Sequence, residues 1–302
     1  MKKRILWIAL ALALTLAACT GRPAAGSGSS SAPQPENTPA VETPSPVPTE
    51  QPAPGSFTVS EMRVERDGLS IYGQLYTPDG AEGPLPAVIL SHSANVTSDT
   101  MHAYCEKIAR QGFVAYAFDF CGGSKDSRSD GAEADMTVFT EVADLKAVLQ
   151  AVGALDCVDS SRVFLFGTSQ GGLVSAITAA DCPADVRGLI LFYPAFNIPE
   201  MAQKFGSYAG DTAFIESLKD YDVYAGIQAY TGDVLILHGT KDFIVPSSYS
   251  EQAAEVYQNC ELHLIEGASH GFNEENYAMF GDYDAETWPY AEAFLAAHTQ
   301  PE

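Results

Sequence analysis

Short apolar runs recur along the chain from residue 57 to residue 265, and their character changes after the second run. The first two, residues 57–65 and 69–76, alternate apolar and polar positions, which is typical of antiparallel strands with one exposed face. The next six runs are largely continuous, as expected for strands buried on both faces of a parallel sheet. They comprise residues 86–91, 113–120, 162–166, 188–194, 233–238 and 261–265.

Segments with helical spacing lie between these runs. The clearest covers residues 137–152, where one side carries Val138, Val142, Leu145, Leu149 and Val152. The other segments are residues 98–111, 170–180, 247–258 and 285–298. An antiparallel strand pair followed by alternating strands and helices predicts an α/β fold, with a mostly parallel eight-stranded sheet and helices on both faces.

One long connection interrupts this alternation, between the sixth and seventh strands at about residues 197–231. An insertion beside the functional edge of a sheet usually acts as a lid or cap, and we expect a cap here. Its aromatic residues either contact a substrate or pack the cap onto the domain, and packing is the commoner role. They are Phe205, Tyr208, Phe214, Tyr221, Tyr224 and Tyr230.

The first 56 residues have a different composition from the remainder. Residues 1–18 have the basic start, short apolar stretch and small residues of a secretory signal peptide. The sequence "LAAC" resembles the lipobox of bacterial lipoproteins, so we expect lipid on Cys19. Residues 19–56 are rich in Pro, Ser, Gly and Ala and are predicted to form a disordered tether. The expected protein is exported and lipid-anchored to the membrane, with residues 57–302 forming one extracytoplasmic domain.

The net charge and the cysteine spacing argue against nucleic acid, anionic lipid and metal ions as binding partners. The formal net charge is −23, from 16 Lys and Arg against 39 Asp and Glu. So acidic a chain is a poor partner for nucleic acid or anionic lipid, which leaves the N-terminal lipid as the only expected membrane contact. The five cysteines beyond Cys19 lack the spacing of metal ligands, and several are expected to be small buried residues. No metal site is predicted.

Candidate chemistry begins at the pattern Gly-x-Ser-x-Gly, residues 167–171. It follows the buried strand at 162–166 and precedes the helix at 170–180, which is the setting of a nucleophile elbow centred on Ser169. In so sharp a turn, a side chain at Gly167 or Gly171 would collide with the neighbouring strand or helix. We therefore predict Ser169 as a nucleophile.

A serine hydroxyl needs a base, and His270 is the best placed of six histidines. It lies in a Gly-bounded loop after the last predicted strand, at the edge where parallel α/β sheets bind ligands. Asp242 lies in the loop after the preceding strand and is the candidate for orienting the imidazole. The chain order Ser169, Asp242, His270 is that of the α/β-hydrolase triad. The backbone N–H of Gln170 and one from residues 91–99 are expected to bind the oxyanion.

These residues resemble the α/β-hydrolase superfamily from about residue 57 onward. The segments "FDFCGGSKDSRSDG", "GTSQGGLVS", "LILHGTKDFIVPSSYS" and "HLIEGASHGF" resemble its bacterial feruloyl/cinnamoyl esterase-like branch, also grouped with serine aminopeptidase-type hydrolases. The resemblance implies an α/β-hydrolase fold, a cap between strands six and seven, hydrolysis of a small ester through an acyl-enzyme, and no cofactor. It implies Ser169, Asp242 and His270 as the triad and Gln170 as an oxyanion donor.

One motif departs from this family. The loop after the third strand usually has His-Gly and then a bulky residue, whereas this chain has Ser93 and Ala94. The Ala94 N–H is the expected second oxyanion donor, provided that Ser93 can adopt the backbone angles required there. Three functions follow: a serine esterase, which we favour, a peptidase acting on short peptides, or an inactive hydrolase-fold binding lipoprotein.

Overall fold

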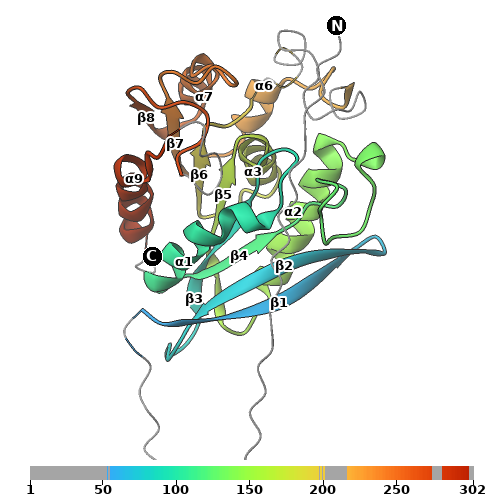
Figure 1. Cartoon of the computed structure of the whole chain (residues 1–302), viewed down its shortest axis with the longest axis vertical. Helices are drawn as coiled ribbons and strands as arrows, with labels where there is room; N and C mark the ends of the chain where they lie inside the picture. Colours follow the sequence, from blue (N-terminus) through green and yellow to red (C-terminus); the bar gives the residue numbers. More distant parts are fainter. Residues whose placement is uncertain are drawn as a thin grey trace, which may run out of the picture. The chain divides into compact units, whose positions relative to one another are not determined.

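All eight predicted strands form, and they join in one sheet (Figure 1). The strands are β1 (Phe57–Arg66), β2 (Leu69–Pro78), β3 (Leu85–Ser91), β4 (Val114–Phe118), β5 (Val158–Thr168), β6 (Gly188–Phe192), β7 (Asp233–Gly239) and β8 (Asn259–Ile265). Their order in the sheet is β1-β2-β4-β3-β5-β6-β7-β8. β2 pairs antiparallel with both β1 and β4, and every later pairing is parallel. The predicted eight-stranded, mostly parallel sheet is thus confirmed. The last strand was also expected to be buried on both faces, and this was wrong: β8 lies at the edge of the sheet, and only Ile265 of its residues is buried.

This computed structural model describes residues 53, 55–196, 198, 200, 216–273 and 281–298. The predicted signal peptide, Cys19 and nearly all of the tether lie outside the described residues, so the lipid anchor stays a prediction. Among the residues described, no helix combines the length and the apolar character needed to cross a membrane.

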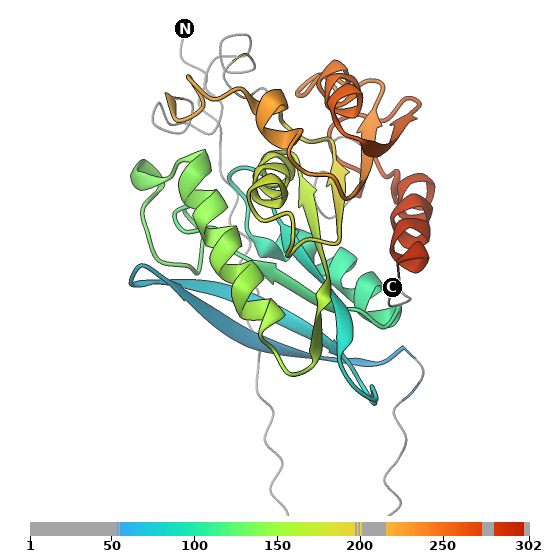
Figure 2. The ribbon, with the colours of Figure 1, turned by 180° about the vertical axis from the view of Figure 1, so that it is seen from behind.

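Helices cover both faces of the sheet, as Figures 1 and 2 show from opposite sides. The helices are η1 (Ser98–Met101), α1 (His102–Arg110), η2 (Glu133–Asp135), α2 (Val138–Gly153), α3 (Gln170–Asp181), α6 (Val223–Ile227), α7 (Ser248–Val256) and α9 (Asp284–Ala297). Alternate residues of β3 point to opposite faces: Ala87 and Ile89 join the core beneath α2, α3, α6 and α7, and Val88 and Leu90 join the core beneath α1 and α9. Each strand in the middle of the sheet is therefore apolar on both sides.

Helix α2 begins at a capping box. The Thr137 hydroxyl accepts from the Thr140 N–H, and the Thr140 hydroxyl accepts from the Thr137 N–H. The five apolar residues predicted to share one side of this helix are all buried. Two carboxylates, Glu141 and Asp144, are buried beside them, which the spacing of apolar residues did not predict.

Strand β4 ends earlier than its apolar pattern suggested, because Asp119 and Phe120 leave the sheet. The buried Asp119 carboxylate accepts from Ser98 N at 2.8 Å and from Arg128 N and Nε at 2.9 and 3.0 Å. These bonds offset the desolvation of the carboxylate and hold the loop after β4 against the start of η1.

The connection between β6 and β7 contains α6, but part of the predicted cap, including Phe205, Tyr208 and Phe214, lies outside the described residues. The three described aromatics all have packing partners. Tyr221 packs edge-on against Phe139 of α2, Tyr224 donates to Tyr249 O, and Tyr230 donates to Val186 O. These contacts favour the packing role for all three.

Candidate active site

Ser169 lies in a strained turn between β5 and α3. Its backbone angles are φ 51° and ψ −115°, a combination that non-glycine residues rarely adopt. The turn is tight because its two glycines, Gly167 and Gly171, have no side chain and let neighbouring backbone atoms come close. A Cβ at Gly167 would lie 2.3 Å from Gly171 O, and a Cβ at Gly171 would lie 2.3 Å from Ser91 O. The collisions predicted for these two glycines are confirmed.

Gly171→Ala is therefore expected to destabilise the protein by about 2–4 kcal/mol, although alanine is the better helix former. The new methyl group would meet backbone oxygens of Ser91 and His92, which cannot rotate away as a side chain could. Urea unfolding measures the difference. Gly153→Ala, in α2, is the matched control: its Cβ has no close neighbour, so a gain of up to about 1 kcal/mol is expected. Equal stabilities for the two variants would contradict the steric argument.

Asp242 and His270 lie together because β7 and β8 are parallel neighbours whose following loops are hydrogen-bonded to each other. Thr240 N donates to Ile265 O at 3.0 Å, and Lys241 N donates to Ala268 O at 2.9 Å. Gly239 permits this approach, since a Cβ there would lie 2.3 Å from Ala268 O. The two loops therefore form one unit at the carboxyl edge of the sheet.

The three predicted triad residues form a hydrogen-bonded chain. His270 Nδ1 lies 2.7 Å from Asp242 Oδ2, and His270 Nε2 lies 3.1 Å from Ser169 Oγ. Since the carboxylate can only accept, Nδ1 carries the proton and Nε2 is free to accept the serine proton. All three side chains are at least nine-tenths buried, and the Tyr193 ring packs 4.7 Å from the imidazole. This arrangement can convert the Ser169 hydroxyl into a nucleophile.

A second histidine, His238, also contacts the Asp242 carboxylate. Its Nε2 lies 3.3 Å from Oδ2 and 2.8 Å from Val245 O, and its Nδ1 lies 2.7 Å from Ser250 Oγ. The other carboxylate oxygen, Oδ1, accepts from the backbone N–H groups of Ile244 and Val245. Burial alone would raise the pKa of Asp242, but hydrogen bonds from His238 and His270 hold that pKa far below its usual value. Asp242 is therefore ionised at neutral pH.

The Ser169–Gln170 peptide is held firmly at its carbonyl end. Ser169 O accepts from Gly172 N at 3.0 Å, Leu173 N at 3.3 Å and Ala195 N at 3.0 Å. Because the peptide is planar and trans, these bonds also fix the Gln170 N–H, which points the opposite way. As the first residue of α3, Gln170 has no acceptor for this N–H within the helix. It is a preorganised donor beside Ser169.

The Ser93–Ala94 peptide is held in the same way, by His92. The His92 ring accepts from Phe120 N at its Nε2, so its Nδ1 carries the proton and donates to Ser93 O at 2.7 Å. Burial lowers the pKa of His92 and keeps the ring neutral, as this pairing requires. Fixing the Ser93 carbonyl fixes the direction of the Ala94 N–H.

Ser93 does not strain the backbone in the position where the motif discussed above has glycine. Four described non-glycine residues have positive φ, namely Asp67, Asn95, Ser169 and Tyr193, and Ser93 is not among them. Its hydroxyl instead lies 2.9 Å from Thr168 Oγ1, which ties this loop to the residue before Ser169. A serine is thus compatible with the geometry of this turn.

Sequence reasoning missed the parts played by His92 and His238. Both lie at the carboxyl ends of buried strands, at the same edge of the sheet as Ser169. That position could have indicated from the sequence that they belong to the site. The other histidines lie elsewhere: His102 and His298 are on or beside helices, and His263 is paired with Glu261 in β8.

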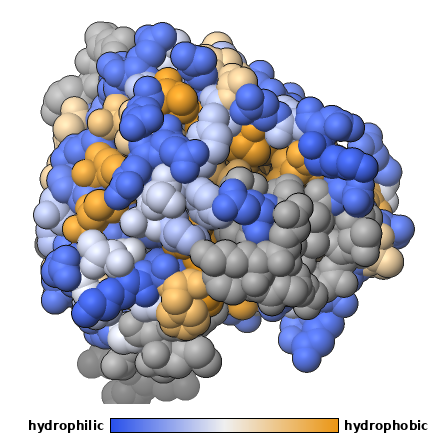
Figure 3. Space-filling model, turned by 90° about the horizontal axis from the view of Figure 1, so that it is seen from above, coloured by the Kyte–Doolittle hydropathy of each residue, from blue (hydrophilic) through white to orange (hydrophobic). Residues whose placement is uncertain are grey.

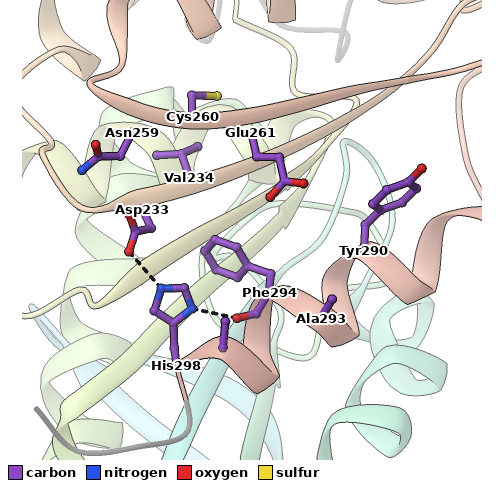
Figure 4. A pocket seen from close by; sticks show the side chains of 10 residues that line it. Asp233, Val234, Asn259, Cys260, Glu261, Tyr290, Ala293, Phe294 and His298 are labelled. Carbon is purple, nitrogen blue, oxygen red and sulfur yellow. Dashed lines mark hydrogen bonds and ion pairs between the residues drawn. The ribbon is translucent and has the colours of Figure 1, made fainter.

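Away from the triad, the described residues present a pocket and small apolar patches, but no metal-binding group. No group of three or more His, Cys, Asp or Glu among the described residues could hold a metal ion. A pocket between α9 and the starts of β7 and β8 lies at the edge of the sheet opposite the triad, and His298 there is bonded to Asp233 and Phe294 O (Figure 4). From above, apolar side chains form small groups among hydrophilic ones (Figure 3).

The sheet, its helices and the strained turn at Ser169 define an α/β-hydrolase fold. Solved structures agree: the structure of Est1E from Butyrivibrio proteoclasticus with bound ferulic acid has a TM-score of 0.69 at 24% identity, covering 78% of this chain and 98% of that one. A predicted CIB-like hydrolase from Thermoplasma acidophilum has a TM-score of 0.57 at 18% identity, covering 80% of this chain and 100% of that one. The predicted fold class is confirmed.

Sequence comparisons point to hydrolases as well. A family model described as "Serine aminopeptidase, S33" matches residues 82–217, which include Ser169 but neither Asp242 nor His270. Human monoglyceride lipase is 26% identical over 144 residues, 47% of this chain and 45% of the lipase. A putative carboxymethylenebutenolidase from Aquifex aeolicus is 28% identical over 153 residues, 47% of this chain and 63% of that protein. The chain therefore spans about half the length of these curated relatives.

Proposed function

We propose that this protein is a serine hydrolase that cleaves carboxylic esters through an acyl-enzyme. The observation that carries the proposal is the continuous hydrogen-bonded chain from Ser169 Oγ through the His270 imidazole to the Asp242 carboxylate. A buried serine with its base and an ionised orienting carboxylate is the arrangement required for nucleophilic acyl transfer. The similarity to an esterase structure and to a lipase supports an ester as the substrate.

In the proposed reaction, His270 Nε2 takes the proton of Ser169 Oγ as Oγ bonds to the ester carbonyl carbon. The carbonyl electron pair moves onto oxygen, and this oxyanion accepts hydrogen bonds from Gln170 N–H and Ala94 N–H. Collapse of the intermediate breaks the bond to the alcohol, which leaves with the proton from His270. Water then attacks the acyl group, gives a proton to His270, and releases the carboxylic acid as Ser169 is reprotonated.

Ala94 has a small side chain where the related family has a bulky one, which favours a wider acyl group. Est1E binds ferulic acid, an aromatic acid, and we propose aromatic acyl esters as a substrate class to test beside aliphatic ones. A peptide substrate is the second candidate, favoured by the serine aminopeptidase description of the matching family model.

A fluorophosphonate probe and a substrate panel test these proposals together. Ser169 in the folded chain is expected to react with the probe, whereas Ser169→Ala is not. The panel contains nitrophenyl esters of increasing chain length, a feruloyl ester and an aminoacyl anilide, with esters expected to be cleaved fastest. Faster cleavage of the anilide would favour the peptidase, and a folded protein without labelling would favour the binding lipoprotein.

A further inference from the structure

Glu141 is a buried carboxyl group next to the proposed oxyanion site, and the proposed reaction does not use it. It lies in the first turn of α2, which packs against α3, and it has no exposed surface. Its two oxygens lie 2.7 and 2.9 Å from Nε2 of Gln170, whose side chain is also buried. The residue after the proposed nucleophile is therefore bonded from a neighbouring helix through its side chain.

No cation compensates this carboxyl group in the described part of the chain. Arg66, the last residue of β1, bonds to the neighbouring buried carboxylate of α2, Asp144, and Lys146 of α2 bonds to Asp181. Burial raises the pKa of Glu141 well above its usual value; the Gln170 amide lowers it in part, and the charge of Asp144 raises it further. A buried carboxylate without a cation is costly, whereas a protonated carboxyl is not. Burial without a cation therefore favours the neutral form of Glu141.

A neutral carboxyl matches the hydrogen-bonding groups of a carboxamide. It has one donor and one acceptor, and so does the Gln170 amide, although only the Nε2 end of that amide faces the two carboxyl oxygens. Among the described residues, Oε1 of Gln170 is buried without a partner. If the amide turns over, Oε1 takes the place of Nε2 and accepts the O–H of a protonated Glu141, so the pair stays bonded when Glu141 is neutral.

The same residue, Gln170, carries the proposed oxyanion donor on its backbone. Its N–H belongs to the peptide whose other end is the strained Ser169, with φ 51° and ψ −115°. Relaxing the Ser169 ψ angle would swing this peptide and redirect the N–H. The hydrogen bonds between the Gln170 side chain and Glu141 of α2 oppose that motion.

We infer that Glu141 is a positioning residue for the oxyanion donor: as a neutral carboxyl, it pairs with the Gln170 carboxamide and holds the start of α3 on α2. This inference rests on the proposed function. The neutral form matters because a carboxylate bonded to the Gln170 side chain would repel the negative charge that develops on the substrate oxygen.

Kinetics of matched variants test this role. Glu141→Gln preserves one donor and one acceptor, so kcat for a nitrophenyl ester is expected to stay within about 3-fold of wild type. Glu141→Met removes the pairing, and kcat is expected to fall by about 10- to 100-fold with KM nearly unchanged. The upper end of this range corresponds to the loss of one oxyanion donor. Val152→Ala, a core truncation three turns further along α2, is the control and should leave kcat unchanged.

A double variant separates positioning from stability. Glu141→Met combined with Gln170→Met replaces both polar partners by apolar side chains of similar length, which is expected to restore the thermal midpoint lost in each single variant. The inference predicts that kcat stays low in this stable double variant. Recovery of kcat together with stability would mean that Glu141 is only structural, and would overturn the inference, as would an inactive Glu141→Gln.

An infrared measurement tests the neutral carboxyl without relying on catalysis. The spectrum of the wild type at neutral pH is expected to contain a protonated carboxyl C=O band that is missing from Glu141→Gln. Absence of that band in an active enzyme would overturn this inference alone. A wild type without esterase activity would instead refute the proposed function, and the catalytic part of this inference with it.

Discussion

Ser169→Ala is expected to lower kcat for ester hydrolysis by about 10⁵- to 10⁶-fold, the largest effect predicted for this chain. Alanine removes the Oγ atom that forms the acyl-enzyme and leaves His270 Nε2 with no proton to accept at 3.1 Å. The fold should persist, because the helix and strand on either side of the turn are unchanged. Steady-state kinetics with a nitrophenyl ester, together with the thermal unfolding midpoint, measure both quantities.

Ser175→Ala is the matched control for this variant. Ser175 lies further along α3, fully buried, and its hydroxyl has no partner among the described residues. Removing that hydroxyl should leave kcat unchanged and stability equal or higher. Full activity in Ser169→Ala would show that another group is the nucleophile, and would end the triad proposal.

Asp242→Asn is expected to lower kcat by about 10⁴-fold. The carboxylate accepts the Nδ1 proton of His270 at 2.7 Å and so keeps Nε2 unprotonated toward Ser169. The two backbone N–H groups at Oδ1 require an acceptor, so the amide of asparagine must present its NH₂ group to the imidazole. Nδ1 then becomes an acceptor, the proton moves to Nε2, and the base is lost.

Stability against pH provides a second measurement on the same pair of proteins. The pKa of Asp242 is lowered in the folded protein, so its ionisation stabilises the fold above the unfolded-state pKa of about 4. This contribution is lost as the pH falls below that value. The stability difference between wild type and Asp242→Asn should therefore shrink on acidification. Asp159→Asn, at the amino end of β5, is the control and should retain kcat; a similar loss in both variants would contradict the assigned role.

The pattern of apolar and polar residues predicted the secondary structure well, because it reflects directly which positions are buried. The continuous apolar strands β3 to β7 have both faces covered, so their composition alone distinguishes them from the half-exposed β1 and β2. β4 shows the limit of this reasoning. Its apolar run continues to Phe120, but the strand ends at Phe118, and the Asp119 carboxylate bonds to Arg128 and Ser98, which lie 9 and 21 residues away on either side of it in the chain.

Side-chain contacts between elements could not be predicted in the same way. Glu141 has an ordinary helical position next to an apolar stripe, and its burial depends on where α3 lies. His238 looked like the end of a strand, and its contact with Asp242 arises from the turn that follows β7. Likewise, His92 contacts Phe120 N only because β3 and β4 are neighbours in the sheet.

Local composition and spacing were enough to predict the order of strands and helices, the glycines that permit the Ser169 turn, and the chain order of Ser169, Asp242 and His270. Three further features could be seen only in the folded chain: these three side chains form one hydrogen-bonded chain, Ser93 avoids a positive φ, and Glu141 bonds to Gln170. Hydrogen-bond partners that are distant in sequence meet only when strands and helices pack together, and the periodicity of one element does not specify which elements lie beside it.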